Sequence, residues 1–82
     1  MMYPYMTLND DTEITYSNIY PDGKVKVYIE TPDEKGGFYD AVCWLPDYIW
    51  EVHGYSELQM KYFRKLIQDD ASIIMELSQS II

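Results

Sequence analysis

The stretch from Ser56 to Ile82 constrains the fold most, because its apolar residues recur with the 3.6-residue period of an amphipathic α-helix. It opens with Ser56-Glu57-Leu58-Gln59, which fits a capping box. In that motif the Ser hydroxyl and the Gln side chain bond backbone amides that the first turn leaves free. Neither Pro nor Gly follows Ser56 in the sequence. The pattern therefore predicts one long C-terminal helix.

Asp70 interrupts the apolar pattern of this helix. With Phe63 as the centre of the stripe and about 100° per residue, Asp70 lies near the middle of the apolar face. Burying an unpaired carboxylate costs several kcal/mol. Three alternatives follow. The helix kinks or ends near Asp69, or Asp70 pairs with a cation or hydroxyl of the sheet, or Asp70 faces a groove as part of a functional site.

The length of the helix raises a second question. A helix over residues 57–80 spans roughly 36 Å, whereas strands of six to eight residues reach only about 20–26 Å. Either the helix bends, or its distal half, which carries Ile73, Ile74, Leu77 and Ile81, packs against a partner. We expect the partner to be a second copy, giving a homodimer through the C-terminal helix.

The residues before the helix read as short strands between polar turns. Lys24–Glu30 alternates most clearly, with Val25, Val27 and Ile29 on one face. Strands are also predicted over Glu13–Tyr20 and Phe38–Leu45. The predicted fold class is α+β: a single domain over residues 1–82, with a small antiparallel β-meander of three to four strands packed against one long C-terminal helix.

Two segments have more than one interpretation. Met1–Leu8 is apolar and aromatic but contains Pro4, so it either adds an edge strand or covers one end of the core. Tyr48–His53 is either a short strand or a helical turn. Both bear on the same question, which is whether anything covers the second face of the sheet.

That second face carries aromatic residues. If Val25, Val27 and Ile29 pack on the helix, the opposite face holds Tyr28 and, by proximity across strands, three residues of the third predicted strand: Phe38, Val42 and Trp44. This face is either covered by Met1–Leu8 or Trp50, or it is a binding surface. A one-residue slip in register would exchange the two faces.

The net charge of −8 argues against direct binding to nucleic acid or to anionic membranes. A sharper interpretation is that the acidic side chains imitate phosphates and block a nucleic-acid-binding protein. The single Cys43 allows no disulfide within one chain, which fits a reducing cytoplasm. No apolar run approaches membrane-spanning length.

The sequence carries no catalytic or metal-binding motif. His53 is the only histidine and Cys43 the only cysteine, so one chain cannot supply a zinc site of His and Cys ligands. The glycines fit no phosphate-binding pattern. We therefore predict a protein that is not an enzyme and uses neither a cofactor nor a metal.

Two resemblances add to this interpretation. Tyr3-Pro4-Tyr5-Met6-Thr7-Leu8, Asp11-Thr12-Glu13, Glu30-Thr31-Pro32 and Leu45-Pro46 through Gly54-Tyr55-Ser56 resemble a family of short Gram-positive bacterial proteins of unknown function, over nearly the whole chain. Gly37-Phe38-Tyr39-Asp40-Ala41, Leu45-Pro46-Asp47 and Gly54-Tyr55-Ser56 are similar to the layout of HicB-type antitoxins. That likeness implies a toxin partner, but the chain departs from the family in lacking a C-terminal DNA-binding extension.

The functional expectation is a small, cytoplasmic, bacterial protein-interaction or regulatory module that binds a partner as antitoxins do. The predicted contact residues lie on the aromatic sheet face and on the distal helix: Tyr28, Phe38, Val42, Trp44, Asp70, Ile73, Leu77 and Ile81. The alternative is an acidic inhibitor that mimics nucleic acid and binds a DNA- or RNA-binding protein.

Overall fold

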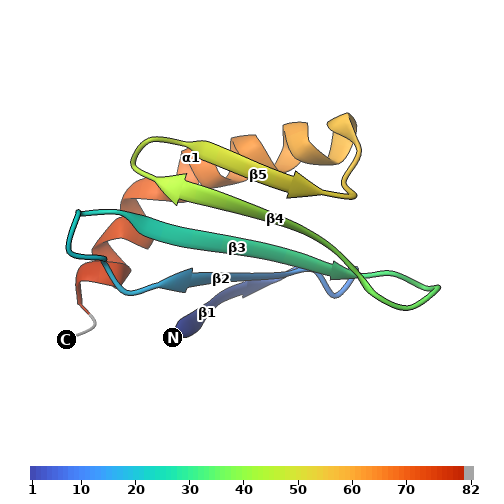
Figure 1. Cartoon of the computed structure of the whole chain (residues 1–82), viewed down its shortest axis with the longest axis horizontal. Coiled ribbons are helices and arrows are strands. Elements are labelled where there is room, and N and C mark those ends of the chain that lie inside the picture. The colour runs from blue at the N-terminus through green and yellow to red at the C-terminus, as the bar shows by residue number, and fades with distance from the viewer. Residues whose placement is uncertain (81–82) are drawn as a thin grey trace.

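A computed structural model describes residues 1–80 as five strands followed by one helix (Figure 1). The elements are β1 (Met2–Thr7), β2 (Glu13–Ser17), β3 (Val25–Pro32), β4 (Phe38–Leu45), β5 (Ile49–His53) and α1 (Glu57–Gln79). The strands are antiparallel neighbours in chain order, β1-β2-β3-β4-β5. The α+β class is confirmed. The expected three to four strands were wrong, because both ambiguous segments pair as edge strands.

The core lies between α1 and one face of the central strands. Val25, Val27 and Ile29 of β3 are fully buried, as their alternation predicted. In the register between β3 and β4, Val27 is opposite Cys43 and Ile29 is opposite Ala41, and both β4 residues are also fully buried. Period-two alternation therefore places the apolar residues of both strands under the helix.

The predicted capping box is present at the start of α1. The Ser56 hydroxyl accepts from the Gln59 amide at 3.2 Å, and the Gln59 side-chain oxygen accepts from the Ser56 amide at 2.8 Å. Gly54 turns the chain from β5 into this cap with φ of 97°, and a Cβ there would lie 2.6 Å from the Tyr39 ring. Only glycine fits that turn without displacing the ring.

The buried stripe of α1 is rotated from the one expected. Its members are Met60, Phe63, Ile67, Ala71, Ile74 and Ser78. At 100° per residue the centre of this stripe lies about 40° from Phe63, on the side of the small residues Ala71 and Ser78. The Ser78 hydroxyl donates to the Ser17 carbonyl oxygen at 2.6 Å, which fixes this side against β2. Asp70 consequently lies at the border of the stripe, and its expected central position was wrong.

The expected overhang of the distal helix was also wrong, since Ile74 and Ser78 are fully buried. Figure 1 shows why: α1 crosses behind the sheet diagonally, from the end of β5 toward the far end of β2. Eight-residue strands span about 27 Å and five strands about 19 Å across, which gives a diagonal of about 33 Å. The 23 residues of α1 span about 35 Å. The fifth strand and the diagonal crossing supply the missing cover.

Candidate interaction surface on the open sheet face

The face of the sheet that turns away from α1 is formed by the residues that alternate with the core. In Figure 1 the helix lies entirely on the other side of the sheet. We call this surface the open face and define it by the alternate residues of the last three strands, Lys26, Tyr28, Glu30, Asp40, Val42, Trp44, Ile49, Glu51 and His53. Most of these side chains are only half buried, because neighbouring strands screen their sides and leave their tops free.

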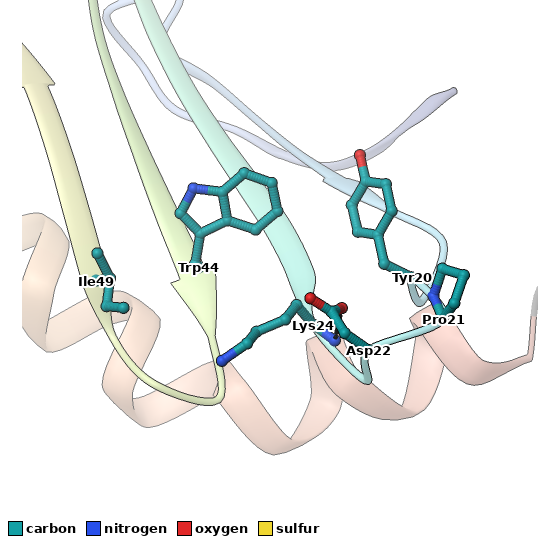
Figure 2. Close-up of a pocket in the computed structure, with 6 residues that line it drawn as sticks. All are labelled: Tyr20, Pro21, Asp22, Lys24, Trp44 and Ile49. Atoms are coloured by element: carbon teal, nitrogen blue, oxygen red, sulfur yellow. Dashed lines mark hydrogen bonds between the residues drawn. The ribbon is translucent and has the colours of Figure 1, made fainter.

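At one end of the open face the side chains surround a hollow of about 510 Å³ (Figure 2). Its residues come from the β2–β3 turn and from the adjoining ends of β4 and β5: Tyr20, Pro21, Asp22, Lys24, Trp44 and Ile49. The rings of Tyr20 and Trp44 lie 5.8 Å apart, centroid to centroid. The Trp44 indole N–H donates to a Glu51 carboxylate oxygen at 3.1 Å. Two aromatic rings therefore line the hollow, and a hydrogen bond to Glu51 orients one of them, Trp44.

At the other end of the open face the side chains are acidic. Glu13 is opposite Glu30, Glu30 is opposite Asp40, and Asp40 is opposite His53, so one row crosses β2, β3, β4 and β5. The Tyr28 hydroxyl donates to Glu30 at 2.9 Å. Burial, together with the nearby carboxylates, raises the pKa of Tyr28 to about 12. Like charges that face each other across strands destabilise a sheet, so we expect this row to lower stability slightly.

The structure brings three of the predicted surface residues together. Tyr28 and Val42 are direct cross-strand partners, and Trp44 follows Val42 on the same face. Phe38 is on this face as well, at the far end of β4 opposite Pro32, and it is largely exposed. Phe38 therefore lies beyond the acidic row and away from the hollow.

Sequence reasoning missed Tyr20 and Ile49 as parts of the surface. Tyr20 precedes the Pro21-Asp22-Gly23 turn, and its contact with Trp44 depends on the register of β3 with β4. Ile49 is the direct partner of Trp44 across β4 and β5. Once Tyr48–His53 is taken as a strand, Ile49 and Trp50 must lie on opposite faces of the sheet. This alternation is the signal that could have assigned Ile49 to one face.

Neither segment expected to cover the open face does so. Met2–Thr7 pairs beside β2 as β1 and extends the sheet. Trp50 is opposite Cys43, on the side of the sheet that α1 covers, and packs against the core. Among the residues that the structure describes, no segment lies across the open face.

On the opposite side of the molecule, Asp70 has a partner from the sheet. The Tyr5 hydroxyl donates to an Asp70 carboxylate oxygen at 2.7 Å, and α1 runs unbroken through this position. Burial and this carboxylate raise the pKa of Tyr5 to about 12. Of the three alternatives for Asp70, pairing with a sheet hydroxyl is the one observed.

The other predicted helix residues remain on the surface. Ile73 is 50% exposed and Leu77 is 38% exposed. Ile81 lies outside the described residues. Ile73 and Leu77 therefore form a small apolar strip beside the buried stripe of α1, well separated from the open face.

Cys43 and His53 occupy different environments, one buried and one on the surface. Cys43 is fully buried, and burial raises its thiol pKa to about 12, so almost no thiolate forms near neutral pH. Nδ1 of His53 lies 2.9 Å from an Asp40 carboxylate oxygen on the exposed surface. Within residues 1–80, no three His, Cys, Asp or Glu side chains are arranged as a metal site would require.

No family model, curated protein or solved structure matches this chain. The two resemblances drawn from sequence motifs therefore remain predictions. Over residues 1–80, no helix combines the length and the apolar character needed to cross a membrane.

Proposed function

We propose that this chain is a small non-enzymatic interaction module that binds a partner protein through the open face of its sheet. In its biological setting it acts as a cytoplasmic bacterial regulator, with a partner held as antitoxin domains hold their toxins. The observation that carries the proposal is the aromatic hollow between Tyr20, Trp44 and Ile49, which no described segment covers.

The composition of this surface supports a protein partner. Trp and Tyr are enriched among the residues that dominate binding energy at protein interfaces, because they bury a large apolar area and also offer a polar group. Trp44 lies beside Tyr20 and Ile49, and Glu51 already orients its indole. A rigid aromatic wall loses little conformational freedom on binding, which favours affinity.

A comparative pull-down from the source cells tests the proposal. The open-face variant carries Trp44→Ala and Ile49→Ser. The control variant carries Leu58→Ser and Tyr62→Ser, which remove two exposed apolar side chains from α1. We expect the wild type and the control to retain one protein in near-stoichiometric amount, and the open-face variant to lose it. Equal recovery by both variants, or no recovery by the wild type, would reject the proposal.

The acidic row favours a second candidate function, imitation of nucleic acid. Glu13, Glu30 and Asp40 follow one another across adjacent strands about 4.8 Å apart, which places several negative charges in a line. The target would then be a DNA- or RNA-binding protein. This candidate predicts that Glu13→Gln, Glu30→Gln and Asp40→Asn together abolish partner recovery, whereas the first predicts that the Trp44 and Ile49 substitutions do.

Homodimerisation through the distal helix is a separate proposal. Ile73 and Leu77 supply the remaining exposed apolar surface on this part of α1. Light scattering at micromolar concentration measures it directly. A dimeric mass that becomes monomeric in Ile73→Glu supports self-association, and a monomeric wild type rejects it.

A further inference from the structure

The two edges of the sheet are protected to different degrees. β1 carries Pro4, which has no N–H to offer, and its register with β2 shifts between Pro4 and Met6. Both features are common ways of preventing another strand from adding to a sheet. β5 contains neither Pro nor Lys and pairs with β4 in an unbroken register from Ile49 to His53. Its outer backbone edge therefore lacks both of the protections that β1 has.

The side chains of β5 also suit an added strand. Ile49 is 56% exposed on the open face, and Val52, on the side of the sheet that α1 covers, is 40% exposed. Residues opposite each other on adjacent strands have Cβ atoms about 5 Å apart. A sixth strand beside β5 would thus cover apolar surface on both sides of the sheet.

The charges around β5 indicate which residues an added strand would carry. On the open face Glu51 is opposite Val42, and the carboxylates of Asp40 and Glu30 lie in the next row, which begins at His53. The cation of β3 on this face is Lys26, which is opposite Trp44. On the helix side, Arg64 lies near Trp50 in the surface groove between β5 and α1. A complementary strand therefore presents basic side chains to the open face and apolar side chains to the helix side.

The same charges disfavour a second copy of this chain as the added strand. Each chain carries a net charge of −8, and pairing two β5 strands would join two acidic open faces into one surface. The like charges of the two faces would repel each other and lower the association rate. The complementary occupant is a segment of a different, basic protein.

We infer that the outer edge of β5 receives an extended segment of a partner protein as a sixth strand, with alternating basic and apolar residues. A Lys or Arg lies opposite Glu51, and an apolar residue lies opposite Val52. The inference rests on the proposed function, because it names the partner segment that docks beside the open face. Main-chain hydrogen bonds supply affinity in this mode, and the alternating side chains supply specificity.

A display library of random peptides of about eight residues, a usual strand length, tests this inference on the intact protein. We expect the selected peptides to alternate basic with apolar residues. The best peptide is then synthesised in two forms, one unmodified and one N-methylated at every second amide nitrogen. N-methylation keeps every side chain but removes the donors needed for strand pairing, so we expect binding at least about tenfold weaker.

A pair of charge-reversal variants locates the site. Glu51→Lys changes β5, and Glu76→Lys makes the same change in charge on an exposed position of α1. We expect Glu51→Lys to weaken the unmodified peptide by about tenfold or more and Glu76→Lys to leave it within about twofold.

The outcomes separate this inference from the proposed function. If the N-methylated peptide binds as well as the unmodified one, or if no alternating basic peptide is selected, the sixth strand is rejected. The proposed function still stands in that case if the Trp44 and Ile49 substitutions abolish partner recovery in the pull-down. If the alternating peptide binds at β5 but those substitutions leave partner recovery unchanged, the edge binds the partner and the open face does not.

Discussion

The two faces of this sheet share their backbone but differ in environment. Val27 and Ile29 of β3 are completely buried beneath α1, whereas Tyr28 between them points to the open face. In β4 the fully buried Cys43 likewise separates Val42 from Trp44. β-propensity cannot explain the contrast, because apolar residues occur on both faces. The faces differ because the single helix α1 crosses and covers only one of them (Figure 1).

The two faces are therefore expected to contribute differently to folding stability and to binding. Folding buries the central residues of the covered face completely, so its side chains contribute most of the hydrophobic stabilisation. The open face gains less from folding, and under the proposed function its aromatic hollow is where the partner binds. The account therefore predicts large stability effects on one face and small ones on the other. The following experiments test that division in order of decreasing effect.

The largest difference is expected between Ile29→Ala and Val42→Ala. Ile29 is completely buried, so its truncation should lower the free energy of unfolding by about 2–5 kcal/mol. Val42 is half exposed on the open face, so its truncation should cost less than about 1 kcal/mol. Urea denaturation measures both values. Equal losses would show that the open face also contributes to the core.

A smaller effect is expected at the border of the covered face, where Tyr5 bonds Asp70. Tyr5→Phe leaves the carboxylate without its donor and should cost about 1–2 kcal/mol, while Tyr62→Phe on the exposed side of α1 should cost almost nothing. Asp70→Leu should also destabilise, and the Tyr5→Phe/Asp70→Leu double variant should lose less than the sum of the two. Strict additivity would contradict the pairing.

Alkaline pH probes one tyrosine on each side of the sheet. The folded pKa of both Tyr5 and Tyr28 is raised to about 12 from an ordinary value of 10.0. The neutral hydroxyls therefore stabilise the fold fully below about pH 10, and this contribution is lost as the pH rises toward 12. Thermal unfolding over this window should show a shallower loss of stability in Tyr5→Phe and in Tyr28→Phe than in the wild type. Parallel curves would contradict the raised pKa values.

The smallest effect is expected in the acidic row. Glu30 faces Glu13 on one side and Asp40 on the other, so Glu30→Gln should stabilise the protein by about 0.2–0.5 kcal/mol at low salt. The gain should vanish at high salt because screening removes the repulsion. Glu34→Gln, in the exposed β3–β4 turn, should change little. A loss of stability in Glu30→Gln would mean that the Tyr28 hydrogen bond outweighs the repulsion.

The sequence predicted those features that depend on local pattern. Alternation in Lys24–Glu30 identified the covered face, and Ser56 with Gln59 identified the helix start, because the responsible contacts lie within a few residues. The Tyr5–Asp70 bond joins positions 65 residues apart, and no local pattern specifies it. The rotation of α1 likewise depends on the bond from Ser78 to Ser17, which joins positions 61 residues apart.

The candidate surface was predictable only in part for the same reason. Alternation places Val42 and Trp44 on one face of their strand and Tyr28 on one face of its own, and the register of β3 with β4 joins them on the same face. The hollow also needs Tyr20 and Ile49. Their positions beside Trp44 can be predicted only if the registers of three strands are known. Long-range register, which sequence pattern leaves open, decides where the hollow forms.

Site-specific photo-cross-linking in the source cells tests the central claim most directly, namely that the open face is the binding surface. A photoreactive amino acid replaces Trp44 on the open face or, as the matched control, Tyr62 on the exposed side of α1. We predict one specific protein adduct from position 44 and none from position 62. An adduct from position 62 with none from position 44 would contradict the account.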